Sequence, residues 1–176
     1  MPKNLNRKNI RLPAPNYTGI REYFVTICCH KRAPLLARSE NVLPILEQLK
    51  SSALSYSFSV HASCAMPDHL HILVAGASDS SRLLNFVKSF KQRTGYEFRK
   101  RTGAQLWQFK SYDHILRRGD GMERVAWYIW MNPVRKGLCN QPAEFPYSGS
   151  FTMEWRDQPQ PQRLWNPPRA PLQRHG

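Results

Sequence analysis

The sequence predicts an α+β domain with an antiparallel sheet, in the ferredoxin-like split βαβ arrangement with one additional helix. Short β-branched and aromatic runs alternate with longer segments in which apolar residues recur at helical spacing. Two of these runs are separated only by Pro67 and Asp68, a connection short enough to require an antiparallel hairpin. In chain order the elements are β-α-β-β-α-β-α, which is typical of this fold. Because the fold hosts many functions, it does not predict a chemistry.

The first half of the chain supplies a strand, a helix and the hairpin. EYFVTICCH (22–30) is β-branched and aromatic and predicts a buried strand. The helix follows over 39–57, with Ser39 as its expected N-cap. FSVHASCAM (58–66) and HLHILVAG (69–76) then predict the two hairpin strands.

The second half predicts two further helices around one strand. A helix is expected from Ser80 or Ser81, and its outer side carries basic residues, among them Lys88, Lys91 and Arg93. A fourth strand is expected over 112–117. The last helix should begin near Met122 with a capping box of Asp120 and Glu123, be disturbed at Asn132-Pro133, and stop at Gly137.

The domain organisation follows from composition. Residues 1–20 are rich in Lys, Arg, Asn and Pro and predict a basic arm, and residues 21–150 form the expected domain. Residues 156–176 are rich in Pro, Gln and Arg and predict a flexible tail without a core of its own. The first residues contain no apolar signal segment and no stretch is long enough to span a bilayer, so we expect a cytoplasmic protein.

The charge balance indicates a polyanionic partner. Lys and Arg total 26 against 12 Asp and Glu, a formal net charge of +14. Such an excess is typical of nucleic-acid binding, because neutralising phosphates releases condensed counterions. The alternatives are a merely basic protein or one that binds anionic lipid, but no basic amphipathic helix or lipidation signal supports the second.

The cysteines do not predict a zinc motif or a disulfide. Cys28, Cys29, Cys64 and Cys139 include no C-x-x-C pair. The first three lie among apolar, strand-like residues, so we expect them to be small core residues in a reducing compartment.

His69 and His71 are the first candidates for chemistry. Side chains alternate along a strand, so both imidazoles should project from one face and form a pair of metal ligands. An isolated H-x-H is equally consistent with the polar face of a half-exposed strand.

Tyr128 and Asn132 are four residues apart and should lie on one helical face, with Arg124 and Arg135 near it. A carboxamide oxygen is an acceptable ligand for Mg²⁺ or Mn²⁺, so Asn132 would complete a three-ligand site if this helix packed beside the hairpin. The alternatives are an amphipathic tyrosine at a helix edge and an asparagine that merely ends the helix.

Four segments resemble the REP-associated tyrosine transposases, bacterial relatives of the single-tyrosine insertion-sequence transposases within the HUH nuclease group. They are MPDHLHILV (66–74), LWQFKSYDHILRR (106–118), WYIWMNPVRKGL (127–138) and FPYS (145–148), in order over roughly residues 20–150. The resemblance implies that His69 and His71 are the metal pair, Tyr128 the nucleophile and Asn132 the third ligand. Asp113 and His114 match a recurring pair that either orients a ligand or belongs to the fourth strand.

The resemblance also implies the reaction: metal-dependent cleavage of single-stranded or hairpin DNA through a 5′-phosphotyrosine, with a free 3′-OH that later rejoins the strand. Basic side chains of the arm (Arg7, Lys8, Arg11) and of the second helix would track the DNA backbone. Trp107, Tyr112 and Trp130 are either stacking surfaces for bases or core residues. The active unit is expected to be a monomer or a homodimer.

Two rival functions remain open at this point. A non-catalytic single-strand binder would explain the charge but leaves the histidines, Tyr128 and Asn132 as coincidence. A zinc hydrolase would use the histidines with Asp68 or Cys64. Asp68 precedes His69 directly and on a regular strand would face away from it, which weakens the second rival.

Overall fold

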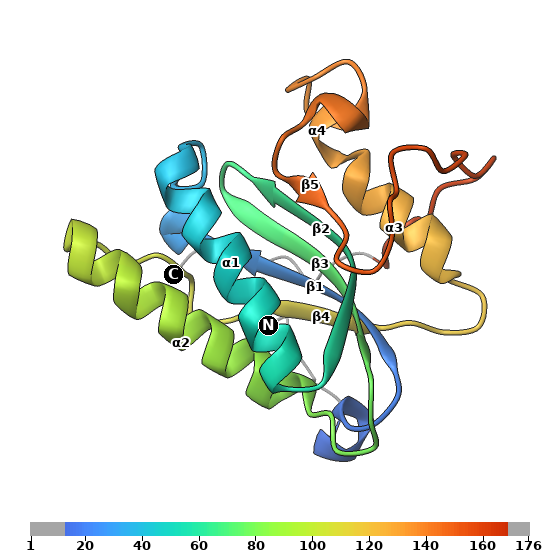
Figure 1. Ribbon diagram of the computed structural model, residues 1–176, viewed down its shortest axis with the longest axis horizontal. Helices are drawn as coiled ribbons and strands as arrows, with labels where there is room; N and C mark the ends of the chain where they lie inside the picture. Colours follow the sequence, from blue (N-terminus) through green and yellow to red (C-terminus); the bar gives the residue numbers. More distant parts are fainter. Residues whose placement is uncertain (1–12, 169–176) are drawn as a thin grey trace, which may run out of the picture.

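The computed structural model describes residues 13–168 and contains a five-stranded antiparallel sheet in the order β4-β1-β3-β2-β5 (Figure 1). The strands are β1 (Glu22–Cys28), β2 (Phe58–Met66), β3 (His69–Gly76), β4 (Tyr112–Ile115) and β5 (Ser148–Gly149). The first four have the order of the ferredoxin-like fold, which confirms the predicted class. β5 is an addition that pairs with the outer edge of β2.

The helices cover both faces of the sheet (Figure 1). They are α1 (Ser39–Ser55), α2 (Leu83–Thr102), α3 (Met122–Trp130) and the short α4 (Asn132–Arg135), with 3₁₀ turns at Ala14–Tyr17, His30–Arg32 and Pro142–Glu144. α1 and α2 pack together on one face, while α3 packs against β2 and β3 on the other. None of the helices within residues 13–168 is both long and apolar enough to cross a membrane.

Alternation along β3 divides its side chains between two apolar clusters. Leu70, Ile72 and Val74 belong to the cluster under α1 and α2, whereas Leu73 belongs to the cluster under α3. His69 and His71 have the same parity as Leu73, so both imidazoles lie on the α3 face. Cys28, Cys29 and Cys64 are buried, as expected of core residues.

The hairpin and the break in the last helix are as predicted. Met66 pairs with His69, so Pro67 and Asp68 form the two-residue connection. Helical hydrogen bonding changes from α3 to α4 at Asn132-Pro133, and Gly137 ends the turn with a φ of +68°. Glycine adopts this left-handed conformation without steric cost, which explains why the chain can reverse there.

Both predicted helix caps are wrong. The N-cap of α1 is Arg38, with Ser39 inside the first turn, and the N-cap of α3 is Gly121 with a φ of +70°. Asp120 does not cap α3 because its carboxylate accepts hydrogen bonds from the His114 ring, the Arg117 amide and the indole of Trp165. Ser81 precedes α2, and its hydroxyl donates to the Ser57 carbonyl.

The segment after residue 155 packs on the domain as far as the structure describes it. The sequence predicted no core of its own for this tail, and it instead contributes Trp165 to the cluster under α3, to which Trp155 also belongs. Trp155 stacks on Trp130 with ring centroids 4.5 Å apart. This packing brings the tail to the face that carries the histidines.

Candidate metal and tyrosine site

The histidine rings of β3 converge on one point. Nε2 of His69 lies 3.0 Å from Nε2 of His71, and both residues are buried. Two ligands bound about 2.1 Å from one ion at a right angle, the geometry that Mg²⁺ prefers, would be about 3.0 Å apart. The spacing of the two nitrogens therefore fits a shared divalent ion.

Asp68 orients His69. Its carboxylate lies 2.5 Å from Nδ1 of His69 and 3.3 Å from the Arg32 guanidinium. The hydrogen bond from His69, together with the positive charge of Arg32, holds the pKa of the Asp68 carboxyl below its usual range. An ionised carboxylate can only accept, so Nδ1 of His69 donates and Nε2 keeps its lone pair for a metal.

Asp68 was predicted to face away from His69, and that prediction is wrong. The alternation rule applies within a strand, but Asp68 lies in the turn that precedes β3 and bends back to the ring. It acts as a partner of His69 rather than as the ligand of a zinc hydrolase.

Thr26 holds the second ring. Its hydroxyl lies 2.9 Å from Nδ1 of His71, across the β1–β3 pair in which the two residues are partners. A hydroxyl can donate or accept, so it suits His71 whether Nε2 carries a proton or binds an ion. Burial, with the nearby positive charges of Arg135 and Arg32, lowers the pKa of His71 well below its usual value. His71 is therefore the neutral imidazole that metals require.

Tyr128 lies beside the histidines on α3. Its ring centroid is 6.4 Å from that of His71 and 5.9 Å from that of Phe24. The guanidinium of Arg135 lies 4.2 Å from the centre of the Tyr128 ring and also donates to its backbone carbonyl. Arg135 therefore places a positive charge beside the tyrosine ring.

Asn132 is buried near the start of α4, one turn after Tyr128. Within residues 13–168 its carboxamide forms no hydrogen bond with either histidine, and no three His, Cys, Asp or Glu side chains gather in a metal-binding arrangement. A third protein ligand at this site would therefore have to be of another type, and Asn132 is the buried amide on the same helical segment as Tyr128.

Cys64 was the other expected zinc ligand of the hydrolase alternative. Burial raises the pKa of its thiol to about 12. Cys64 pairs with His71 across β2 and β3, but within residues 13–168 no group of three His, Cys, Asp or Glu side chains gathers to hold a metal, so the geometry does not favour that alternative.

Trp165, in the C-terminal segment after residue 155, packs against the ring of Tyr128. Its ring lies 5.4 Å from that of Tyr128 and 5.0 Å from that of Phe24, and its indole donates to Asp120 at 3.0 Å. The composition of the Pro-rich segment did not predict this contact.

These observations describe two paired imidazoles with a tyrosine and an arginine beside them. A sequence profile described as "Transposase IS200 like" matches residues 20–129, which include both histidines and Tyr128. The chain belongs to the IS200-like transposase family. It is therefore an enzyme that cleaves and transfers DNA strands, and the predicted resemblance is confirmed.

Individual relatives of this IS200-like transposase support the family assignment. A protein assigned as a REP-associated tyrosine transposase in Haemophilus influenzae is 24% identical over 137 residues, 72% of this chain and 77% of its own. The REP-associated tyrosine transposase of Escherichia coli is 26% identical over 110 residues, 56% of this chain and 62% of its own.

Two solved structures share the fold. The structure of a REP-associated tyrosine transposase bound to a REP hairpin has a TM-score of 0.67 at 19% identity and covers 80% of this chain and 81% of its own. A protein assigned as a transposase from Deinococcus radiodurans has a TM-score of 0.50 at 18% identity, over 76% of this chain and 97% of its own.

The predicted DNA-binding side chains of this IS200-like transposase lie in different places. Arg135 lies at the tyrosine, whereas Arg124 donates to the Gly119 carbonyl at the loop before α3. Lys88, Lys91 and Arg93 are on α2, behind the sheet from the histidines. Arg7, Lys8 and Arg11 lie outside the described residues.

The Asp113–His114 pair belongs to β4 and splits between the two faces. His114 is opposite Phe24 on the site face and bonds Asp120 at 2.9 Å, while Asp113 faces α2. Trp107 and Trp130 are buried, so they are core residues rather than stacking surfaces, and Tyr112 is half-buried.

If His69 is a metal ligand, we expect Asp68→Asn to weaken metal binding by about 10- to 100-fold, because the substitution removes the negative charge that pairs with the His69 ring. The measurement is the Mn²⁺ concentration that gives half-maximal DNA cleavage. Asp79→Asn, at an exposed loop position, is the control. An unchanged half-maximal concentration in Asp68→Asn would contradict the orienting role.

We expect Trp165→Ala to increase the initial rate of strand cleavage by roughly 2- to 10-fold, because it uncovers Tyr128. Trp155→Ala is the matched control: it removes a buried tryptophan from the same cluster, but one that contacts Trp127 and Trp130. Equal rates for the wild type and Trp165→Ala would show that the indole does not limit access.

Proposed function

We propose that this transposase cleaves and rejoins single-stranded or hairpin DNA of the repetitive extragenic palindrome type, with Tyr128 as the nucleophile. The observation that carries the proposal is the pair of Nε2 atoms 3.0 Å apart with the Tyr128 ring beside them. The hairpin bound by the structural relative supports the choice of substrate. The chemistry would reside in residues 21–150, in the cytoplasm, in a monomer or a homodimer.

His69, His71 and Asn132 would hold a divalent ion, Mg²⁺ or Mn²⁺. When bound, such an ion would polarise a phosphoryl oxygen and stabilise the charge that develops there. Asp68 and Thr26 keep the two rings in position through their Nδ1 atoms. The protein's own contribution is thus a preorganised pair of imidazole donors.

The Tyr128 hydroxyl would attack the scissile phosphorus as its proton leaves, and the 3′ oxygen of the upstream strand would depart. One phosphate ester is broken and one is formed, giving a 5′-phosphotyrosine and a free 3′-OH. Attack by a 3′-OH on that linkage reverses the step and rejoins DNA, so no nucleotide cofactor is consumed. A protonated phenol is a weak nucleophile, so the reaction depends on removal of its proton and on positive charge near the phosphate, and the Arg135 guanidinium lies 4.2 Å from the centre of the Tyr128 ring.

The test uses hairpin oligonucleotides with unpaired flanks, labelled at either end and incubated with the protein and Mn²⁺ or Mg²⁺. The expected result is a denaturation-resistant protein–DNA adduct that carries only the 3′ label and disappears with EDTA. An adduct that carries the 5′ label would contradict the polarity, and binding without any cleavage would favour a non-catalytic single-strand binder.

A further inference from the structure

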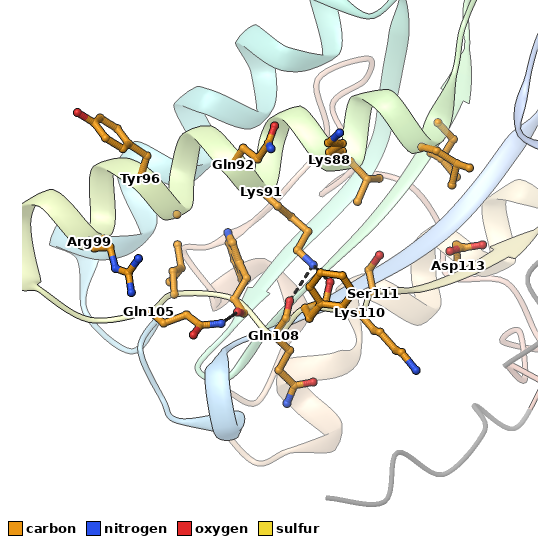
Figure 2. Close-up of a pocket in the computed structure, with 17 residues that line it drawn as sticks. Lys88, Lys91, Gln92, Tyr96, Arg99, Gln105, Gln108, Lys110, Ser111 and Asp113 are labelled. Carbon is orange, nitrogen blue, oxygen red and sulfur yellow. Dashed lines mark hydrogen bonds between the residues drawn. The ribbon is translucent and has the colours of Figure 1, made fainter. Parts of the chain in front are cut away.

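A basic surface lies on the face of the sheet opposite the histidines. It is a groove of about 1050 Å³ between α2 and residues 105–111 (Figure 2). Its volume is at the upper end of the range for ligand sites in proteins. None of the residues that line it belongs to the metal and tyrosine site.

The groove combines an apolar floor with a cationic rim. Leu83, Val87, Leu106 and Trp107 form part of the floor. Its lining includes four cationic residues against one acidic residue, Asp113, and three of the cations are exposed: Lys88, Arg99 and Lys110. This excess of positive charge suits a polyanion rather than an apolar peptide.

Two aromatic rings stand exposed at this groove. The Phe109 side chain is 93% exposed and that of Tyr96 64% exposed, although large apolar rings are normally buried. Proteins that bind single-stranded nucleic acid combine two features: cationic side chains that follow the phosphate backbone, and aromatic rings on which the bases stack.

Lys91 fixes the segment that presents Phe109. Its ammonium donates to the carbonyls of Gln108 and Phe109, both at 2.8 Å, and Figure 2 shows it reaching across the groove from α2. The backbone that carries the ring is therefore anchored, which reduces the entropy lost when a base stacks on it.

The groove adjoins the end of the sheet that carries the metal site. The Gln108 amide donates to the Cys28 carbonyl, and Cys28 pairs with His69 across β1 and β3. Two strand spacings, about 10 Å, thus separate the backbone of the groove wall from that of His69. β4 is an edge strand of the sheet, and from it Asp113 faces the groove while His114 faces the site.

We propose that this groove binds an unpaired segment of the same DNA strand that is cut at the tyrosine site. Bases stack on Phe109 and Tyr96, and the phosphates contact Lys88, Arg99 and Lys110. The choice of DNA as ligand rests on the proposed function, but the groove itself does not contribute to the chemistry.

The test measures binding by fluorescence anisotropy in EDTA, so that no cleavage occurs, with hairpins that carry or lack unpaired flanks. Phe109→Ala should weaken binding of the flanked hairpin about tenfold and leave the blunt hairpin unchanged. Lys88→Gln with Lys110→Gln should lower the salt dependence by about 0.7 per cation removed. These side chains are exposed, so the variants should fold normally.

Leu54→Ala and Lys50→Gln, exposed on α1 and outside the groove, are the controls. Wild-type affinity in the groove variants, or equal losses in the controls, would overturn the proposal. If the groove proposal failed in this way but the protein still formed a metal-dependent adduct, the proposed function would remain intact. Loss of flanked-DNA binding in a protein that forms no adduct would instead support the groove and contradict the proposed function.

Discussion

Tyr128→Phe is expected to abolish the covalent protein–DNA adduct, a loss of at least about 10³-fold in strand cleavage. The substitution removes only the hydroxyl and keeps the ring that contacts Phe24, Trp165 and Arg135. The fold should therefore be unaffected, and a thermal melt would check this. Adduct is measured on denaturing gels with the labelled hairpin.

Tyr112→Phe is the matched control for this experiment. Tyr112 lies on the same face and its ring also contacts that of Phe24, but burial raises the pKa of its phenol. Its variant should form adduct as the wild type does. Cleavage that survived in Tyr128→Phe would instead indicate attack by a metal-activated water and restore the hydrolase alternative.

His71→Ala should lower metal-dependent cleavage by about 10²- to 10³-fold, and His69→Ala by a similar factor. Either variant leaves a single imidazole, and the charge stabilisation that an ion supplies is worth several kcal/mol. Isothermal titration calorimetry with Mn²⁺ would measure the loss of metal affinity directly. The labelled hairpin would measure the loss of strand cleavage.

His61→Ala provides the control for the histidine variants. His61 lies on the neighbouring strand β2 and its ring bonds Thr152 rather than the histidine pair. Its variant should bind Mn²⁺ and cleave as the wild type does. Wild-type activity in both His69→Ala and His71→Ala would contradict a metal site at this position.

Local patterns were sufficient to predict most of the fold. Hydrophobic alternation places the strands, and the two-residue connection at Pro67-Asp68 fixes the hairpin that brings His69 and His71 to one face. The helix caps were not predictable in the same way. Asp120 had three tertiary partners available, and bonding to His114 and Trp165 took precedence over local capping.

The candidate site was predictable only where spacing within one element decides the geometry. Strand parity puts the two histidines together, and helical spacing relates Tyr128 to Asn132. The contacts of Asp68 and Thr26 depend on a turn that bends back and on strand pairing over 45 residues. Trp165 reaches Tyr128 across a Pro-rich segment without periodicity. The groove beside Phe109 depends on how α2 packs, which no local pattern specifies.

The central claim is that Tyr128 itself becomes joined to DNA at a site built on the histidine pair. The most direct measurement is mass spectrometry of the adduct after digestion with protease and nuclease. The account predicts a peptide in which a nucleotide is attached to Tyr128 through a phosphate. This modified peptide should be absent when divalent metal is left out. A nucleotide attached to Tyr112 or to any other residue, or cleaved DNA with no modified peptide, would contradict it.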